Sequence, residues 1–405
     1  MQPELIAQIS TGQLARNLRE VRRVCGPELR ICAALKANAY GHGVDLVAPV
    51  LLREGVEMAA VSTLSEAEEL RDLGWPRPVL VLGQPFAVRS QAERDERLAA
   101  AVRLDLTPTL TSLEDARDLS GRAVAAGRVL DAHVNVDTGM GRMGLMPDEA
   151  LRLCRAVARL RGLRLRGVYT HFGCAEEPDL VHTSDQLARF AGFLARVAED
   201  AQIERPQCVH VANSSATLRG LGQAFDMVRV GLAVYGYHPS PQVPLPEEVR
   251  PILRLVSHLL LVKDLPAGHT VSYGATFVTR KPTRIGVVPI GYADGYLRSL
   301  SNRAVMTVND HVVPVIGRVS MDLTVLDVTD VPDVKTGSLV IVLDHRADRP
   351  NSVESLAELM DTIPYELTCL LGDRIHRTPV DEFEGEPDRP IHLPRAEPTP
   401  QSLTI

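Results

Sequence analysis

Short apolar segments alternate with longer amphipathic segments between residues 31 and 231. The short segments are mostly uncharged and rich in Val, Leu and Ala, a pattern typical of buried strands. We place these strands at 32–36, 58–62, 78–83, 103–107, 129–137, 165–172, 207–213 and 226–231. Between most of them, apolar residues recur every three or four positions, which predicts helices that face a sheet. One of these helices is expected to open with a capping box, because Ser65 precedes Glu68 by three residues.

The number of strand–helix units bears on how the sheet is arranged. Eight units within about 200 residues are what a (β/α)8 barrel contains. An open, doubly wound sheet has the same local pattern, so periodicity alone leaves both arrangements possible. The count of eight favours an α/β fold with an N-terminal TIM-like barrel over residues 11–240.

The pattern changes after Gly236, where a proline-rich stretch leads into segments with period-two alternation. The segments 252–265, 283–293, 304–317, 322–328 and 338–344 predict a C-terminal, mainly β domain over 241–380. Asn309-Asp310 is expected to form a hairpin turn. One helix is expected to start near Asn351, with Glu354 as its N-terminal cap partner. The acidic, proline-rich residues 381–405 predict a flexible tail.

Charge and composition narrow the classes of function. The net charge is −7 and basic runs are matched by acidic ones, which argues against a nucleic-acid partner. No window approaches eighteen uncharged apolar residues and the N-terminus lacks a signal-peptide pattern, so we expect a cytoplasmic protein with no membrane association. The six cysteines are scattered singly, which predicts reduced core thiols and no metal site. These features together favour small-molecule chemistry.

Residues 139–144 spell G-x-G-x-x-G after a predicted strand, the pattern of a dinucleotide-binding loop. The acidic residue expected about 20 positions later is absent, because that region is arginine-rich. The motif also follows the fifth strand–helix unit rather than the first. We therefore interpret these glycines as shaping a barrel loop.

Lys36 is one of only four lysines and lies at the C-terminal end of the first predicted barrel strand. Active sites of barrels lie at the carboxyl ends of their strands. Burial there would lower the pKa of the amine and make it available for a Schiff base or for proton transfer. The alternative is a lysine that reaches solvent from the end of a strand.

The residues around Lys36 belong to a series of motifs that resembles the alanine racemases in order and spacing. The resemblance spans residues 5–377 and implies an N-terminal barrel, a C-terminal β domain, pyridoxal 5′-phosphate and a head-to-tail homodimer. It also implies that residues 1–10 form a strand of the C-terminal domain. The motifs are LKANAYGHG, HVNVDTGMGRMG, VYTHF, HVANSSATL, FDMVRVGLAVYG, VSYGATF, VPIGYADGY, GRVSMDLTV and PYELTCLLGDRIHR.

By this resemblance two residues act as bases on opposite faces of the substrate. Lys36 holds the cofactor as a Schiff base and, once released, serves the D enantiomer. Tyr273 serves the L enantiomer and comes from the partner subunit. The resemblance also places Arg229 at the pyridine nitrogen with His171 as its supporting partner. An arginine that keeps its proton discourages protonation of that nitrogen and so suppresses side reactions.

The remaining site residues are also assigned by the resemblance. Hydroxyl, amide and backbone N–H groups bind the cofactor phosphate, and a second set lines or guards the substrate pocket. The phosphate set is Tyr40, Asn213, Ser214, Gly231 and Tyr365. The substrate set is Arg142, Met321, Tyr292 and Asp322, with Met321 supplied across the dimer interface.

One position departs from the family pattern. Many members have a lysine, often carbamylated, where this chain has Asn135, seven residues before Arg142. Because asparagine is neutral, we expect either a bound anion such as chloride or the amide itself to orient the arginine.

The expected activity is interconversion of L-alanine and D-alanine, which supplies D-alanine for peptidoglycan. A broad-specificity amino-acid racemase is the main alternative, because some of those enzymes also have asparagine at this position. A pyridoxal-dependent decarboxylase disagrees with the Tyr273 motif. A single-barrel pyridoxal phosphate carrier would need neither Tyr273 nor Met321.

Overall fold

The computed structural model describes residues 4–383 and divides into two compact units. One unit spans Thr11–Ile252, and the other combines residues 4–10 with residues 253–383. Most of the tail expected at 381–405 lies outside the described residues. Within 4–383, no helix is both long enough and apolar enough to span a membrane.

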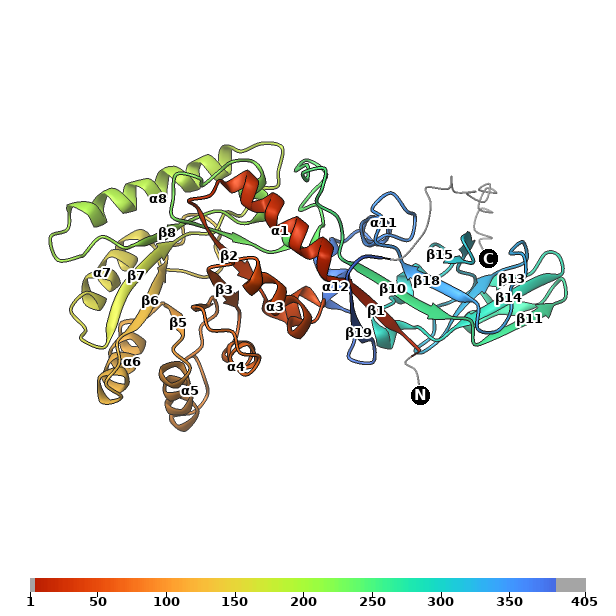
Figure 1. Ribbon diagram of the computed structural model, residues 1–405, viewed down its shortest axis with the longest axis horizontal. Coiled ribbons are helices and arrows are strands. Elements are labelled where there is room, and N and C mark those ends of the chain that lie inside the picture. Colours follow the sequence, from red (N-terminus) through yellow and green to blue (C-terminus); the bar gives the residue numbers. More distant parts are fainter. Residues whose placement is uncertain (1–3, 384–405) are drawn as a thin grey trace, which may run out of the picture. The chain divides into compact units, whose positions relative to one another are not determined.

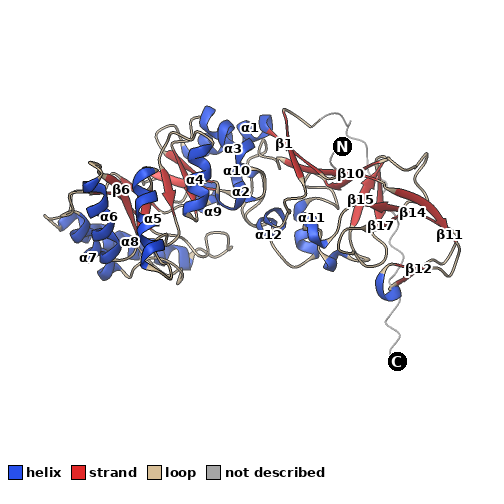
Figure 2. Ribbon diagram, turned by 90° about the horizontal axis from the view of Figure 1, so that it is seen from below, coloured by secondary structure: helices blue, strands red, loops and turns tan. Residues whose placement is uncertain are grey.

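The larger unit is a closed barrel of eight parallel strands surrounded by helices (Figures 1 and 2). The first barrel strand pairs with both the second and the last, which closes the sheet. This confirms the expected fold class. The strands are β2 (Arg30–Ala34), β3 (Met58–Val61), β4 (Val79–Val81), β5 (Thr107–Leu110), β6 (Leu130–Asn135), β7 (Leu163–Tyr169), β8 (Cys208–His210) and β9 (Met227–Val230).

The barrel helices bury one apolar face each, as their spacing predicts. In α7, for example, Ala150, Leu151, Cys154 and Val157 are buried while the opposite face is exposed. The helices of this unit are α1 (Thr11–Cys25), α2 (Lys36–Tyr40), α3 (Val44–Arg53), α4 (Leu64–Asp72), α5 (Gln91–Arg103), α6 (Leu113–Ala125), α7 (Pro147–Val157), α8 (Val181–Glu199), α9 (Ser214–Leu218) and α10 (Leu232–Tyr235).

Two local expectations in the barrel are wrong. The strand expected at 103–107 begins only at Thr107, because α5 continues to Arg103 and the chain turns at Asp105, whose φ is 51°. The capping box of α4 is formed by Thr63 and Glu66 rather than by Ser65 and Glu68. The hydroxyl of Thr63 accepts from the Glu66 N–H, and the Glu66 carboxylate accepts from the Thr63 N–H. The Ser65 pattern fails because the helix has already begun at Leu64.

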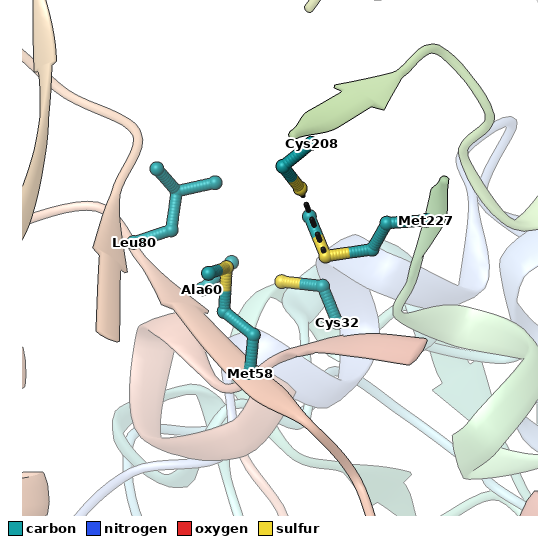
Figure 3. Packing of buried hydrophobic residues seen from close by; sticks show 6 residues of the cluster. All are labelled: Cys32, Met58, Ala60, Leu80, Cys208 and Met227. Carbon is teal, nitrogen blue, oxygen red and sulfur yellow. Dashed lines mark hydrogen bonds between the residues drawn. The ribbon is translucent and has the colours of Figure 1, made fainter. Parts of the chain in front are cut away.

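Side chains from strands on different sides of the barrel fill its interior (Figure 3). This cluster includes four sulfur-containing residues, and the Cys208 thiol donates to Met227 Sδ over 3.9 Å. The barrel at this level is therefore a packed core rather than a pore. The cluster consists of Cys32, Met58, Ala60, Leu80, Cys208 and Met227.

The smaller unit is mainly β, as expected. Its largest sheet has six strands in the order β16-β15-β18-β10-β1-β19, and a three-stranded sheet has the order β11-β14-β17. The first strand of the chain, β1 (Ile6–Ser10), pairs antiparallel with β10 (Leu253–His258) and parallel with β19 (His376–Val380). The other strands are β11 (Leu261–Leu265), β12 (Thr270–Val271), β13 (Phe277–Val278), β14 (Thr283–Val288), β15 (Val305–Val308), β16 (His311–Pro314), β17 (Thr324–Asp327) and β18 (Leu339–Leu343).

Asn309 and Asp310 form the predicted two-residue turn between β15 and β16, with φ values of 44° and 66°. The late helix α11 (Val353–Leu359) is capped by Ser352, whose hydroxyl accepts from the Ser355 N–H. Glu354 is therefore not the cap partner, contrary to expectation. A second short helix, α12 (Pro364–Cys369), was not expected, and three 3-10 turns cover Tyr273–Ala275, Tyr292–Asp294 and Arg298–Leu300.

Candidate active site

Lys36 lies where β2 ends and the chain enters a left-handed turn. Four consecutive residues, Ala37 to Tyr40, have φ values of 52°, 51°, 52° and 55°. Each such residue that is not glycine costs roughly 1–2 kcal/mol. A conformation this unfavourable persists only where the surrounding structure holds it.

Two hydrogen bonds hold the turn. The Ala37 N–H donates to Glu66 Oε1 over 2.8 Å, and the Val44 N–H donates to Asn38 Oδ1 over 2.7 Å. Glu66 Oε2 accepts from the Ser62 and Thr63 N–H groups, so this one carboxylate joins the turn to the start of α4. Lys36 is thus attached to a backbone whose path is fixed on both sides.

The ends of β8 and β9 bring a set of polar groups toward Tyr40. Asn213 caps α9 by accepting from the Ala216 N–H over 3.0 Å. Ser214 Oγ accepts from the Gly231 N–H over 2.9 Å. A Cβ at Gly231 would lie 2.6 Å from Tyr40 Oη, so only glycine allows this approach. The structure therefore brings together four of the predicted phosphate ligands: Tyr40, Asn213, Ser214 and Gly231.

Arg229, on β9, is only 7% exposed and is surrounded by acceptors. Its Nη2 donates to the Thr170 carbonyl over 2.9 Å and to the Val211 carbonyl over 3.2 Å. The same nitrogen lies 3.1 Å from His171 Nδ1, which confirms that these two side chains are neighbours. Burial and the Arg229 charge lower the pKa of His171 to about 3. His171 is therefore neutral and can accept from the guanidinium.

His210 is a further partner of Arg229 that the sequence analysis did not single out. Its Nδ1 lies 2.6 Å from Nη1 of Arg229, and its ring stacks on Tyr169 with centroids 4.7 Å apart. Burial and the arginine charge lower the pKa of His210 well below its ordinary value. The HVAN motif contains this histidine, but one histidine in a strand carries no signal that separates a site residue from a core residue.

His210 also belongs to a buried group of metal-ligand type. The ligand atoms of His133, Cys208 and His210 lie within 4.8 Å of one another. However, Nδ1 of His210 faces the Arg229 guanidinium, and its Nε2 bonds to His133. A cation here would lie beside a fixed positive charge and would displace both hydrogen bonds. We therefore describe Arg229, His210 and His133 as a hydrogen-bonded chain.

The glycine-rich segment forms a loop between β6 and α7. The Gly139 N–H donates to Asp137 Oδ1 over 2.9 Å, and the Gly141 N–H donates to the same carboxylate. A Cβ at Gly144 would lie 3.1 Å from Cγ of Asn135. The glycines thus allow a tight loop that presents Arg142 at the surface and lets Gly144 pack against the buried Asn135.

The predicted site residues of the smaller unit lie on exposed turns or on α12. Tyr273 is 71% exposed, Met321 is 54% exposed, and Tyr292 is also exposed. Asp322 accepts from Arg374 Nη1 over 2.8 Å. Tyr365 lies half-buried in α12. The structure does not place these residues relative to the barrel.

The barrel groups fit pyridoxal phosphate. Hydroxyls, a side-chain amide and the helix starts of α9 and α10 suit a phosphate, and Gly231 leaves space beside Tyr40. Both terminal nitrogens of Arg229 are already occupied by protein acceptors, whereas its Nε–H makes no hydrogen bond within residues 4–383. That N–H is therefore available to a ring nitrogen. The lysine at the end of β2 carries an amine of the kind that forms a Schiff base with an aldehyde.

An eight-stranded barrel with a lysine, an arginine and phosphate-type donors at its strand ends defines a barrel enzyme that acts on small molecules. The family model "Alanine racemase, N-terminal domain" matches residues 9–239, and the family model "Alanine racemase, C-terminal domain" matches residues 252–379. The chain therefore belongs to the alanine racemase family, whose members are isomerases.

Individual relatives agree with this assignment. "Alanine racemase 2" of Caldanaerobacter subterraneus subsp. tengcongensis is 36% identical over 381 residues, which cover 94% of this chain and 95% of the relative. The structure of alanine racemase from Bacillus anthracis with bound L-Ala-P has a TM-score of 0.84 and 31% identity, covering 94% and 96% of the two chains. Alanine racemase from Bartonella henselae with covalently bound pyridoxal phosphate has a TM-score of 0.80 and 27% identity, covering 94% and 100%.

Proposed function

We propose that this protein interconverts L-alanine and D-alanine with pyridoxal phosphate bound through Lys36. The observation that carries the proposal is the meeting of Tyr40, Ser214, Gly231 and Arg229 at the barrel end where β2 leads into Lys36. Family membership supports the alanine substrate, and the bound L-Ala-P of the Bacillus anthracis enzyme agrees with it.

The cofactor, when bound, withdraws electrons from the substrate and so makes its α-proton acidic. Asn213, Ser214, Gly231, Tyr40 and Tyr365 would hold its phosphate. Arg229 would donate a hydrogen bond to the ring nitrogen without giving up its proton, because a guanidinium keeps its charge in proteins even where burial lowers its pKa, as it does here. His171 would hold Arg229 in that orientation.

The two proton-transfer residues would face opposite sides of the substrate. Lys36 would remove or return the α-proton of D-alanine, and Tyr273 that of L-alanine. Tyr273 is 71% exposed, so its side chain is accessible to a second copy of the chain. We infer a homodimer in which Tyr273 and Met321 complete the partner's site.

Further residues that match the family motifs would complete the substrate pocket. Arg142 would face the substrate carboxylate, and Tyr292 and Asp322 would stand at the entrance. Because Asn135 is neutral, a bound anion or its own amide would orient Arg142. The D-alanine formed would serve peptidoglycan synthesis in the cytoplasm. The matched family models and relatives give no support to a broad-specificity racemase.

The proposal is tested by isotope exchange. The cofactor-loaded protein is incubated separately with L-alanine, L-serine and L-lysine in deuterated water, and both α-proton loss and D-enantiomer formation are followed. We expect exchange with inversion that is largely confined to alanine. Comparable inversion of lysine would indicate the broad-specificity alternative. Exchange without inversion, or no reaction despite bound cofactor, would refute racemisation.

A further inference from the structure

Three buried side chains form a line through the barrel interior behind the proposed cofactor site. Nη1 of Arg229 lies 2.6 Å from Nδ1 of His210, and Nε2 of His210 lies 3.0 Å from Nδ1 of His133. The two histidines have no exposed surface. The line runs from β9 through β8 to β6.

The strand between the two histidines is shaped to allow this contact. Gly167, on β7, pairs with His133 on one side and Cys208 on the other. A Cβ at Gly167 would lie 2.7 Å from Cε1 and Nε2 of His133. Any side chain at this position would therefore push the imidazole out of its place. The space for His133 depends on this glycine.

The positions of the protons in this line follow from the chemistry of arginine. A guanidinium has N–H donors and no acceptor, so Nδ1 of His210 must be the acceptor. The proton of His210 is then on Nε2, and it is donated to Nδ1 of His133. The opposite tautomer of His210 would set a donor against a donor in a fully buried site.

Other contacts fix the position of the His210 ring, so only its tautomer can change. Its ring is stacked on Tyr169 with an interplanar angle of 12°, and Arg229 lies over the same Tyr169 ring at 5.0 Å. The Tyr169 hydroxyl is hydrogen-bonded to Thr109 over 3.0 Å, which fixes the ring itself. His210 therefore cannot swing away from Arg229, and its partner at Nε2 decides which atom it presents.

We propose that His133 is a positioning residue for Arg229. It accepts the Nε2 proton of His210, which keeps Nδ1 of His210 unprotonated and directed at the guanidinium. This inference rests on the proposed function for its effect on the reaction. With the acceptor lost, the proton of His210 moves to Nδ1 for part of the time and displaces the guanidinium from the cofactor ring. Supporting partners of this kind are commonly worth about 10-fold or more in activity.

Two nearly isosteric variants separate the acceptor from the volume of the side chain. His133→Asn keeps an acceptor at the position of Nδ1, whereas His133→Leu removes it. Leu80→Met, which changes another buried residue of the barrel, controls for disturbance of the core. Folding of each variant is checked by thermal unfolding with the cofactor bound.

The first readout is nitrogen NMR of protein labelled at histidine. In the wild type and in His133→Asn, Nδ1 of His210 is expected to be unprotonated and Nε2 protonated. In His133→Leu, a protonated Nδ1 is expected. A protonated Nδ1 in the wild type itself would overturn the inference, whether or not the variants fold. This readout does not depend on catalysis, so it separates failure of this inference from failure of the proposed function.

The second readout is kinetic. We expect His133→Leu to lower kcat for alanine about 10-fold with KM almost unchanged, and to speed conversion of bound cofactor to pyridoxamine phosphate during turnover. His133→Asn should restore both properties to near wild-type values. Equal losses in the two variants, or a loss in Leu80→Met as large as in His133→Leu, would show that only packing matters and would overturn the inference.

Discussion

Single residues of the site differ in how far the sequence alone could identify them. A lysine after a barrel strand is a recognisable candidate, because lysine is rare in this chain and costly to bury. His171, Ser214 and Tyr273 were identified only through their motifs, since each also has an ordinary structural role. His133 and His210 were missed because their importance comes from contacts across the barrel, between residues 77 positions apart.

At the residue scale, Asn135 gives a direct prediction. It is buried at the end of β6, in the loop region that presents Arg142, and carries no charge. If an anion substitutes for a fixed charge, kcat/KM for alanine should rise roughly tenfold when chloride replaces gluconate at constant ionic strength. A tenfold change corresponds to the free energy of about one charge-assisted hydrogen bond. Asn135→Asp should remove this dependence. An Asn135→Asp protein that keeps the wild-type kinetics and halide response would refute the hypothesis that a bound anion orients Arg142.

At the element scale, most strands follow from the apolar pattern, but their ends do not. The strand expected at 103–107 failed because polar and apolar residues alternate in RLDLT as they do in a half-buried strand, whereas residues 103–106 end α5 and form the turn before β5. The left-handed turn at Ala37–Tyr40 could not be predicted, because alanine and tyrosine disfavour that conformation. It exists because tertiary contacts from Glu66 and Asn38 outweigh the local preference.

The contact between α4 and this turn predicts an effect on cofactor binding. Glu66→Ala removes the acceptor for three backbone N–H groups and should lower the free energy of unfolding by about 1–2 kcal/mol. It should also weaken pyridoxal phosphate binding about 10-fold or more, because Lys36 loses its fixed position. Denaturant unfolding of the cofactor-free protein and absorbance titration with the cofactor measure the two effects. Glu69→Gln, an exposed position on the same helix, serves as the control and should change neither.

At the scale of the whole molecule, each of the two units contributes its own core to the free energy of unfolding. The smaller unit contains a buried carboxyl group, Glu354, whose two oxygens have no hydrogen-bond partner within residues 4–383. Burial raises its pKa from the ordinary 4.5 to about 7. Such a group makes folding depend on pH.

The direction of that dependence follows from which state loses the proton first. As pH rises above 4.5, the unfolded chain ionises while the folded chain keeps its proton until about pH 7. The free energy of unfolding should therefore fall by up to about 3 kcal/mol across this range and stay lower above it. Glu354→Gln should abolish this part of the slope and stabilise the protein at pH 8. The control is the exposed Glu358→Gln on the same helix.

The comparison is made by denaturant unfolding at pH 5 and pH 8 at one protein concentration. The difference between variant and wild type isolates Glu354 from other titrating groups. His345, for example, acts in the opposite direction, because burial lowers its pKa to about 4. A pH slope that is the same in wild type and Glu354→Gln would contradict the assignment.

The central claim is that Lys36 of one copy and Tyr273 of another form each site, and mixing subunits tests it most directly. Lys36→Ala and Tyr273→Phe chains are co-expressed with different tags, and the hybrid dimer is isolated. Each homodimeric variant should be nearly inactive toward alanine. The hybrid should regain about half of the wild-type activity, because one of its two sites combines an intact Lys36 with an intact Tyr273 from the other chain. A hybrid as inactive as its parents would show that both residues act within one chain.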